Sequence, residues 1–557
     1  MQQSCRQCQA GFEITDDDLA FLDKVSPVFN GKKEAIPAPT LCPECRLQRR
    51  LAFRNQIHVF SRTSSLSGKQ IFSSWPEDVG FPVISNEEWW GDAWNGLSAG
   101  QTFDFGKSFH EQFHELRSQV PHIARSVSNL ENSDYCVNAG ELKNCYMVFN
   151  TTGGEDGMYC EMMNSSVNTL DCTMIVSSQL CCDCTLCENC YNLQSSQQCE
   201  HCSDSHFLLN CRSCKHCFGC VNLRHAEYCV FNEQKTKAEY DAFLRGLPAS
   251  SHAWREDMRR KTQVFFQQHP RPNVILRQVE QCAGNIVLHS RNVQGSFFCS
   301  NDEDLTYCFG VHGSKDCRDY SVWGNKAELV YEAVSCGINA QRLLCCYEVH
   351  TNTSNMLYCQ GCVGCRDCFG CVGLKKQHHC VFNKQYTKEE YEALVPTIIA
   401  HMRFRGEWGE FFPMTEAFGP YNYSLAQRYF PLTKSEAATQ KLHWYDQQIP
   451  EAKQAVEVSS LPDGLPAQDD PIIVRSALSG RPFKITSEEI RRYRQFNVPL
   501  PRMTYDERME ERIRKLGGIH LYQRACAKTG QSILTTYPPD SPYIIWDRDV
   551  YEKEFGS

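Results

Sequence analysis

Four cysteines near the N-terminus form two Cys-x-x-Cys pairs and are the clearest candidates for chemistry in this chain. The pairs are Cys5 with Cys8 and Cys42 with Cys45. Four thiolates are the ligand number and the soft ligand type that a closed, tetrahedral zinc site takes. The sequence therefore predicts one structural zinc site made of these four residues.

Short elements must position these ligands. Phe12 and Ile14 alternate with polar residues, as in a strand after the first pair. After the second pair, apolar residues recur at helical spacing over residues 46–54. A knuckle, a hairpin and a helix that carries the last two ligands make a treble-clef arrangement. We expect such a module in residues 1–95.

The helix expected after the second pair carries four arginines near one side, Arg46, Arg49, Arg50 and Arg54. Such a face could contact the phosphates of a nucleic acid. Residues 1–60 carry eight basic and seven acidic side chains, however, which favours a solvated helix face neutralised by its neighbours. Nucleic-acid binding through these four arginines is kept as the alternative.

Cysteines in the middle of the chain follow a period of three residues. Between residues 121 and 232, fifteen of sixteen cysteines are separated by multiples of three, and only Cys182 departs. In residues 272–383, nine of thirteen share one phase. Such phasing over long gaps indicates a coil whose turns return the same positions to one interior. We predict a β-solenoid with cysteine as a small buried side chain and with Asn144, Asn189 and Asn210 at tight corners.

This cysteine-rich segment is duplicated. Residues 211–232 recur 151 positions later as residues 362–383. Each copy is followed by a capping box, at residues 236–239 and 387–390, which predicts a helix over the end of the coil. The chain thus contains two tandem repeats of the predicted solenoid.

The two ends of the chain are also related to each other. The pattern around the N-terminal cysteines recurs near the C-terminus, where Ser476, Ser479, Thr504 and Glu507 hold the cysteine positions. The apolar skeleton is retained, but all four thiols are absent. We expect a degenerate copy of the first module in residues 471–557 that binds no metal.

The cysteine runs of the coil also permit a metal interpretation. Residues 181–190 and 211–220 each place four cysteines at gaps of two residues, superficially like an iron–sulfur run. The final step is again two residues, and no proline follows. Stacking without metal is the preferred interpretation, and additional zinc thiolate sites or an iron–sulfur cluster are the alternatives.

The predicted fold is multidomain and mainly β, with two Cys-rich β-solenoid repeats between a zinc-ribbon or treble-clef module and its degenerate copy. The expected order is the zinc module (1–95), a linker with an amphipathic helix (96–120), solenoid repeat 1 with its capping helix (121–245), a helical linker (246–271), solenoid repeat 2 with its capping helix (272–395), an aromatic and proline-rich segment with a linker (396–470), and the metal-free module (471–557).

Composition restricts the class of function. The net charge is −9, no apolar stretch reaches the length of a membrane span, and the N-terminus lacks the apolar core of a secretory signal. Thirty-four cysteines without an export signal favour reduced thiols or metal thiolates in the cytoplasm. No phosphate-binding glycine loop, zinc-protease motif or nucleophile elbow occurs, so no catalytic residue is assigned.

Three motifs carry a family resemblance: Cys42-Pro-x-Cys45-Arg-x-x-x-Arg50, the Cys-Phe-Gly-Cys-Val-x-Leu repeats, and Gly406-Glu-Trp-Gly-Glu-Phe-Phe-Pro413 with Pro431-Leu-Thr-Lys434. Over nearly its whole length the chain resembles a family of uncharacterised zinc-ribbon proteins of uncultivated bacteria. The resemblance implies organisation rather than mechanism, because no activity is established for the family. It also implies cysteines in the C-terminal module, including a second pair near Cys526 and Thr529, which makes Cys526 a relict.

The sequence favours a non-enzymatic zinc-binding scaffold whose solenoid surface meets a macromolecular partner, a protein rather than a nucleic acid. It indicates no membrane association and no small-molecule substrate. A nucleic-acid or ribosome-associated zinc-ribbon factor is the first alternative, and a redox or iron–sulfur protein is the second. A carbohydrate-binding surface is supported only by analogy with other β-helical folds.

Overall fold

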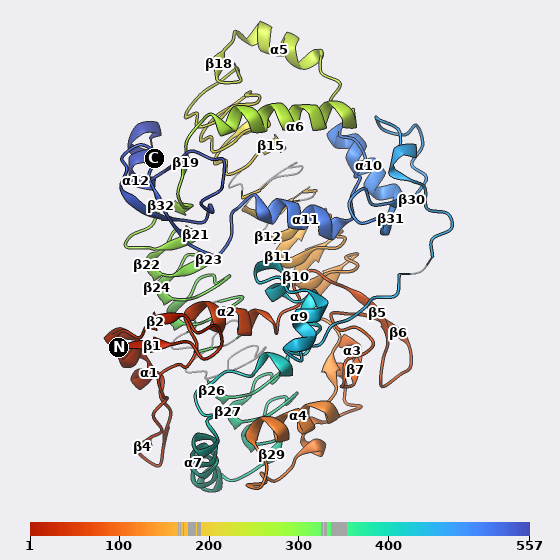
Figure 1. Cartoon of the computed structure of the whole chain (residues 1–557). Coiled ribbons are helices and arrows are strands. Elements are labelled where there is room, and N and C mark those ends of the chain that lie inside the picture. Colours follow the sequence, from red (N-terminus) through yellow and green to blue (C-terminus); the bar gives the residue numbers. More distant parts are fainter. Residues whose placement is uncertain are drawn as a thin grey trace. The chain divides into compact units, whose positions relative to one another are not determined.

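The structure is a computed structural model, and it is mainly β (Figure 1). It describes every residue except 165, 168, 171, 177–184, 187–190, 325, 326, 328–330, 333, 336–353, 450 and 557. The chain divides into two compact units. The first unit contains residues 1–55, 59–125 and 274–445, and the second unit contains residues 56–58, 126–273 and 446–557.

The helices and strands, many of which are labelled in Figure 1, belong to these units as follows. The first unit contains β1 (Gln2–Ser4), β2 (Gly11–Glu13), β3 (Val28–Phe29), β4 (Lys32–Lys33), β5 (Phe60–Thr63), β6 (Gln70–Ser73), β7 (Val83–Ile84), β8 (His122–Ile123), β20 (Leu276–Arg277), β21 (Gly284–Leu288), β22 (Arg291–Gln294), β23 (Ser296–Ser300), β24 (Glu303–Thr306), β25 (Lys315–Arg318), β26 (Ser354–Leu357), β27 (Arg366–Phe369), β28 (His378–Val381), β29 (Lys384–Gln385), and the helices α1 (Asp16–Val25), α2 (Pro43–Leu51), α3 (Asn86–Trp90), α4 (Phe109–Gln119), α7 (Lys388–Arg405), α8 (Leu425–Tyr429) and α9 (Lys434–Thr439). The second unit contains β9 (Val127–Glu131), β10 (Val137–Lys143), β11 (Phe149–Glu155), β12 (Glu161–Asn164), β13 (Ser166–Val167), β14 (Thr173–Val176), β15 (Tyr191–Gln194), β16 (Ser203–His206), β17 (Cys229–Val230), β18 (Glu233–Gln234), β19 (Arg271–Pro272), β30 (Ile472–Arg475), β31 (Pro482–Ile485), β32 (Tyr522–Ala525), β33 (Ser532–Thr535), β34 (Ile545–Trp546), and the helices α5 (Lys237–Arg245), α6 (His252–Gln267), α10 (Ser487–Phe496), α11 (Tyr505–Arg514) and α12 (Arg548–Phe555). None of these helices, within the described residues, has both the length and the apolar character needed to cross a bilayer.

Each unit contains a coil of parallel-paired turns, made by the described residues between 276 and 381 in the first unit and between 127 and 230 in the second. Residues on neighbouring turns are mostly twelve positions apart, as in the pairs Glu200 with Arg212, Ser203 with Lys215, His206 with Phe218 and Leu209 with Val221. These pairs follow one another every three residues. A turn therefore has four sides of three residues each, and the predicted β-solenoid is confirmed.

A corner residue with left-handed backbone precedes every inward-facing coil cysteine for which the preceding residue is described. Asn144 and Asn210, both predicted at corners, have φ angles of 52° and 50°, whereas Asn189 lies outside the described residues. Asparagine tolerates this backbone region because its short polar side chain can hydrogen-bond locally. At such a corner the N–H of Asn144 donates to the carbonyl of Glu131 on the neighbouring turn, at 2.9 Å. The corner turns the chain so that the next side chain points inward.

The interior of the coil in the second unit is lined with thiols. Its described cysteines are buried in one core together with aliphatic residues such as Leu142 and Leu208. Because a twelve-residue turn has four inward positions at three-residue spacing, the threefold phase of the cysteines follows directly from the geometry. The thiols also hydrogen-bond the backbone, as Cys211 Sγ does with the carbonyl of Leu209 at 3.5 Å.

Two turns in the coil of the first unit differ in length. Glu280 pairs with Arg291, eleven positions later, and Arg318 pairs with Tyr331, thirteen positions later. One residue fewer or more shifts the inward positions of the turn that follows into another phase. Cys282 lies at the short turn, which explains why its phase differs from that of later cysteines. Cys182 and the run at residues 181–190 lie outside the described residues.

Each coil ends in a short hairpin and a helix. β17 pairs with β18 and β28 with β29, both antiparallel, and the predicted capping boxes begin α5 and α7. Helix α7 continues through Pro396 and stops at Gly406, whose φ of 71° suits glycine. The predicted boundary at residue 395 therefore falls inside a helix, because capping by Gly406 lies eleven residues beyond it.

The two units share one arrangement of elements. In the first unit, Phe109 of α4 contacts Phe369 and Phe382 of the coil. In the second unit, Trp254 of α6 lies against Phe207 of the coil. The parallel pair of β7 with β8 has its counterpart in β34 with β19. In each unit, a module from one end of the chain is thus combined with a helix and a coil.

Candidate metal centre

The first two predicted ligands lie on a tight turn between β1 and β2. These strands pair antiparallel, with Ser4 opposite Gly11. The N–H of Gln9 donates to the carbonyl of Cys5 at 3.0 Å, and Gln9 has a left-handed φ of 64°. The turn brings Cys5 and Cys8 to one side of the hairpin, as the predicted knuckle requires.

The last two ligands lie on the first turn of α2. Cys42 is the residue before the helix, Pro43 is the first residue of the helix, and Cys45 is its third residue. Proline suits this place because its missing N–H would have no partner inside the helix. The N–H of Arg6 donates to the carbonyl of Thr40 at 3.0 Å, which ties the hairpin to the segment before α2.

The structure brings all four predicted ligands together. Their Sγ atoms all lie within 4.8 Å of one another, and Cys8 Sγ is 3.7 Å from Cys42 Sγ. A tetrahedral zinc ion with bonds of 2.3 Å needs Sγ atoms about 3.8 Å apart. The donor set and its spacing therefore fit a four-coordinate metal held by thiolates.

The thiols of this group are not equivalent. Cys5, Cys42 and Cys45 are buried, and Cys8 is exposed. A hydrogen bond from the Cys45 thiol has the largest influence on Cys42 and lowers its pKa to about 5. A thiol at a helix N-terminus is also stabilised as the thiolate by the helix dipole. Cys42 is thus prepared as an anionic ligand.

The three arginines of α2 and Arg54, which follows the helix, are inside the protein. Each is at most 6% exposed, and each has a polar partner in the first unit: Arg46 with Asp319 (3.0 Å), Arg49 with Glu332 (2.5 Å) and Glu410 (2.7 Å), Arg50 with Asp319 (2.9 Å), and Arg54 with Ser335 (3.1 Å). In this structure the predicted nucleic-acid face is an internal docking face. The partners lie about 270 positions or more away in the sequence, so the charge balance of residues 1–60 alone could not show them.

This docking face pairs buried guanidinium groups with carboxylates. Burial opposes ionisation of Asp319, but the guanidinium groups of Arg46 and Arg50 outweigh it and lower the pKa of this carboxyl. Arg50 also donates to Ser321 Oγ at 2.8 Å. The helix that carries two metal ligands is therefore the same helix that anchors the N-terminal module on the coil.

The turn that carries Cys5 and Cys8 occurs four times in the described part of the chain. We call these turns knuckle 1 (residues 5–10), knuckle 2 (64–69), knuckle 3 (476–481) and knuckle 4 (526–531). In each, the first residue accepts an N–H from the residue four positions later, at 2.8 to 3.0 Å: Gln9, Gly68, Gly480 and Gly530. In each, the second residue donates to the segment before a helix: Arg6 to Thr40, Ser65 to Val83, Ala477 to Arg502 and Ala527 to Ile545.

The helix after each knuckle begins at the equivalent place. Each site therefore has four ligand positions, two on the knuckle and two at the start of the helix that follows it, and the name of the knuckle is used below for the whole site. These positions are Cys5, Cys8, Cys42 and Cys45 for knuckle 1, Ser64, Ser67, Ser85 and Glu88 for knuckle 2, Ser476, Ser479, Thr504 and Glu507 for knuckle 3, and Cys526, Thr529, Asp547 and Val550 for knuckle 4. The third position precedes the helix each time, at Cys42, Ser85, Thr504 and Asp547. The search for cysteine pairs missed knuckle 2, although its Ser-x-x-Ser spacing matches that of knuckle 3.

Knuckle 3 holds a carboxylate where knuckle 1 has its last thiol. Ser476 Oγ donates to Glu507 Oε2 at 2.5 Å, and the N–H of Thr504 donates to the same oxygen at 3.0 Å. Burial opposes ionisation, but hydrogen bonds from Ser476 and Ser479, together with those from Thr504, lower the pKa of Glu507. One carboxylate oxygen of Glu507 thus accepts hydrogen bonds from two of the other three ligand positions.

In knuckle 2 a carboxylate also occupies the fourth ligand position and accepts hydrogen bonds from the first and third positions. Ser64 Oγ donates to Glu88 Oε2 at 2.6 Å, and the N–H of Ser85 donates to it at 2.8 Å. In knuckle 4, Cys526 Sγ accepts the N–H of Asp547 at 3.3 Å. The predicted relict Cys526 is therefore at the first ligand position of a fourth knuckle.

The helix of knuckle 3 docks on its coil as α2 does. The guanidinium of Arg508 lies 4.9 Å from the ring centre of Tyr159, and that of Arg46 lies 5.5 Å from the ring centre of Tyr307. The two tyrosines precede equivalent coil cysteines in the sequence. The same docking is therefore made in one unit with a thiol knuckle and in the other with a carboxylate knuckle.

Within the described residues, the Cys5 group is the only set of three or more candidate ligands this close together. In the coil of the second unit, Cys211, Cys214, Cys217 and Cys220 occupy the four inward positions of one turn, one on each side. Cys220 Sγ accepts the N–H of Asn232 at 3.4 Å. The thiols of the described coil turns are thus engaged with backbone groups.

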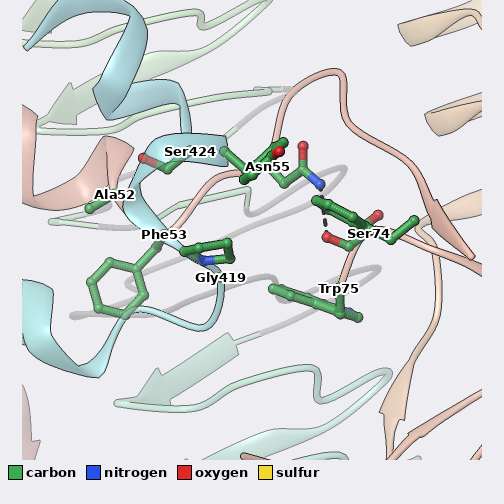
Figure 2. A pocket seen from close by; sticks show the side chains of 10 residues that line it. Ala52, Phe53, Asn55, Ser74, Trp75, Gly419 and Ser424 are labelled. Carbon is green, nitrogen blue, oxygen red and sulfur yellow. Dashed lines mark hydrogen bonds between the residues drawn. The ribbon is translucent and has the colours of Figure 1, made fainter. Parts of the chain in front are cut away.

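Two cavities of the first unit are small. One, shown in Figure 2, lies between Phe53, Trp75 and Gly419 and has a volume of about 10 Å³. Asn55 Nδ2 donates to the carbonyl of Ser74 at its edge, at 2.8 Å. A second, beside Arg46 and Tyr307, measures about 20 Å³. Such volumes hold one or two water molecules rather than a substrate.

Comparisons of this chain with protein-family models, with curated proteins and with solved structures found no match. The site is therefore interpreted from its own geometry.

Proposed function

We propose that this protein is a non-enzymatic, zinc-stabilised scaffold of the cytoplasm whose solenoid surface binds a macromolecular partner. The zinc belongs to the treble-clef module of knuckle 1 and has a structural role. The observation that carries the proposal is the Cys5, Cys8, Cys42 and Cys45 group, which fits a closed tetrahedral site on the helix that docks on the coil.

Three features support a structural rather than a catalytic zinc. All four ligands are thiols, whereas catalytic sites keep a position open for water. Three of the four are buried. The helix that supplies Cys42 and Cys45 continues directly into the buried arginine contacts, so the ion would fix the start of an anchored element.

The coil surface supports a role in binding. Exposed corner asparagines donate to the corner residue of the next turn, as Asn144 does to Asp156 at 3.3 Å and Asn292 does to Asp304 at 2.6 Å. Turns about 4.8 Å apart repeat these amide and carboxylate groups along the surface. Such a regular, partly acidic array suits an extended protein partner better than a polyanionic nucleic acid.

The two alternatives have less support. The nucleic-acid alternative relied on Arg46, Arg49, Arg50 and Arg54, which are buried and paired. The iron–sulfur alternative relied on runs of which one lies outside the described residues and the other is spread over the four sides of a turn. The free thiols of the described cysteines support a reducing compartment.

Elemental analysis of protein purified without oxygen tests the proposal. We expect about one zinc per chain and no iron, because one four-thiol group satisfies the geometry of a closed site. Replacement of zinc by Co²⁺ should give the visible absorption of a tetrahedral thiolate complex. Zinc-free protein with an unchanged fold would disprove the structural role, and stoichiometric iron would favour the redox alternative.

A further inference from the structure

The core of knuckle 1 consists largely of its own ligands. Cys5, Cys42 and Cys45 are buried together with only three other residues, Phe12, Ile14 and Leu41. A core of this size contributes little hydrophobic stabilisation once the thiols are not held together. The geometry of knuckle 1 therefore depends on whatever joins the sulfur atoms.

Helix α2 transmits that geometry to the coil. It begins at the ligand Cys42, and its next turns carry Arg46, Arg49 and Arg50. Three carboxylates face them from the rest of the first unit, those of Asp319, Glu332 and Glu410. Buried ion pairs of this kind require accurate placement, because desolvation of the charges consumes most of their attraction. A helix displaced at its start cannot keep them.

We infer that the metal of knuckle 1 is a latch: its loss releases α2 from the coil of the first unit and exposes the four arginines. This inference rests on the proposed zinc site. In the second unit, α11 is held by the hydrogen bonds of Glu507 and makes the corresponding contact with Tyr159. The second docking therefore does not respond to metal, and the molecule contains its own control.

Oxidation is a chemical route to this release. Cys8 is exposed, and its Sγ lies 3.7 Å from that of Cys42. A hydroperoxide takes two electrons from the two thiolates, so that a sulfur–sulfur bond forms and the oxygen–oxygen bond breaks. Two protons convert the peroxide oxygens to water and an alcohol, or to two waters for hydrogen peroxide. The metal ion leaves when the remaining thiolates of Cys5 and Cys45 take up protons.

Hydrogen exchange and trypsin cleavage of the full-length protein test the latch. The zinc protein is treated with a chelator, or with hydrogen peroxide followed by dithiothreitol and zinc, and its zinc content is measured in each state. We expect exchange in α2 and cleavage after Arg46, Arg49, Arg50 and Arg54 to rise about tenfold or more on zinc loss, because the opening free energy of this segment falls. Exchange in α11 and cleavage after Arg508 and Arg512 should stay unchanged.

A transplanted knuckle provides the matched variant. In C5S/C8S/A10R/C42T/C45E, knuckle 1 receives the polar set of knuckle 3, including the counterpart of Arg481, which lies 3.5 Å from Glu507. We expect this variant to keep α2 protected with or without chelator and peroxide. If it does not fold, the wild-type comparison of α2 with α11 still decides the question.

The possible failures are distinguishable. Protein that contains no zinc at the start contradicts the proposed site itself. Protein that loses one zinc while α2 keeps its protection contradicts the latch alone. Equal loss of protection in α2 and α11 also contradicts it, because the release would then be global unfolding.

Discussion

Knuckle 1 and knuckle 3 have the same backbone turn and the same helix start, but different groups occupy their ligand positions. In knuckle 1 four thiols face one another within 4.8 Å. In knuckle 3 the carboxylate of Glu507 accepts hydrogen bonds from Ser476 and from the N–H of Thr504. The comparison shows that two different sets of groups occupy the same place in the fold: four thiols that could hold a metal ion, or a carboxylate that accepts hydrogen bonds.

The difference lies in what each centre responds to. A metal–thiolate centre depends on metal supply, on redox state and on thiol deprotonation. A carboxylate centre depends only on pH. Both dock a helix on a coil through an arginine beside a tyrosine, Arg46 at Tyr307 and Arg508 at Tyr159. Under our proposal, the docking in the first unit depends on a metal ion, and the docking in the second unit does not.

Removal of a ligand from knuckle 1 should have the largest effect. Cys42→Ser leaves three thiolates and should abolish zinc binding, which in small zinc domains is worth about 10–16 kcal/mol. Zinc content and the thermal unfolding of the first unit measure the loss. The matched change Thr504→Ser in knuckle 3 should leave both unchanged, and a C42S protein that still holds one zinc would contradict the assignment.

Loss of the Asp319 carboxylate, which Arg46 and Arg50 share, should have the second-largest effect on stability. Asp319→Asn leaves the guanidinium groups of Arg46 and Arg50 buried without their anion, which costs about 3–5 kcal/mol. Denaturant unfolding of the zinc protein measures this. Glu489→Gln in the second unit should cost less, because Arg508 lies 3.9 Å from Glu489 and also donates to the carbonyl of Met503 at 2.8 Å. Equal costs would show that the two dockings are held by the same forces.

Neutralisation of Glu507 should have an intermediate effect. Glu507→Gln weakens the charge-assisted hydrogen bonds of knuckle 3 by about 1.5–3 kcal/mol in total. Because the folded protein lowers the pKa of Glu507, the stabilisation is present above the carboxyl's ordinary pKa and is lost as pH falls through the lowered value. The unfolding free energy of the variant should therefore lose this acid-side slope, while its zinc content stays the same.

A carboxyl inside the coil should show the opposite pH dependence. Asp302 Oδ1 accepts the N–H of Ser314 at 2.8 Å, but its Oδ2 has no hydrogen-bond partner among the described residues. Burial raises the pKa of Asp302 to about 8, and the groups that face it, the thiols of Cys299 and Cys308, bring no cation.

Because the folded state holds this proton more tightly than the unfolded state, stability falls as pH rises from about 4 to about 8. The slope contributed by Asp302 is at most about 1.4 kcal/mol per pH unit. Asp302→Asn should remove this slope in denaturant unfolding measured across that range. An unchanged slope would mean that the carboxyl reaches a partner or solvent.

Removal of a thiol from the coil should have the smallest effect on stability. Cys217→Ala removes one sulfur from a fully buried position and should cost about 1 kcal/mol through the small cavity it leaves. Zinc content should not change. A loss of metal in this variant would show that coil thiols are ligands and would remove the contrast between knuckle and coil.

The sequence predicted the features that repeat at fixed spacing. The threefold cysteine phase indicated the solenoid because four sides of three residues make one turn, and the paired cysteines indicated the metal centre. The burial of Arg50 could not be predicted, since Asp319 is 269 positions away and nothing local marks it as the partner. Knuckle 2 was not predicted from the sequence, because serine and glutamate in place of thiols do not form a recognisable metal-ligand pattern.

The long separation between Arg50 and Asp319 also has a consequence for synthesis of the chain. Translation at roughly 5–20 residues per second delivers the 269 intervening residues in about 13 to 54 seconds. Throughout that interval the nascent N-terminal segment carries three arginines, Arg46, Arg49 and Arg50, whose carboxylate partners have not yet been synthesised. The docking partner of the C-terminal segment is already present when that segment is synthesised, because Tyr159 and its neighbours have left the ribosome long before Arg508 is made. A chaperone or an early-bound ion would therefore act on the beginning of this polypeptide and not on its end.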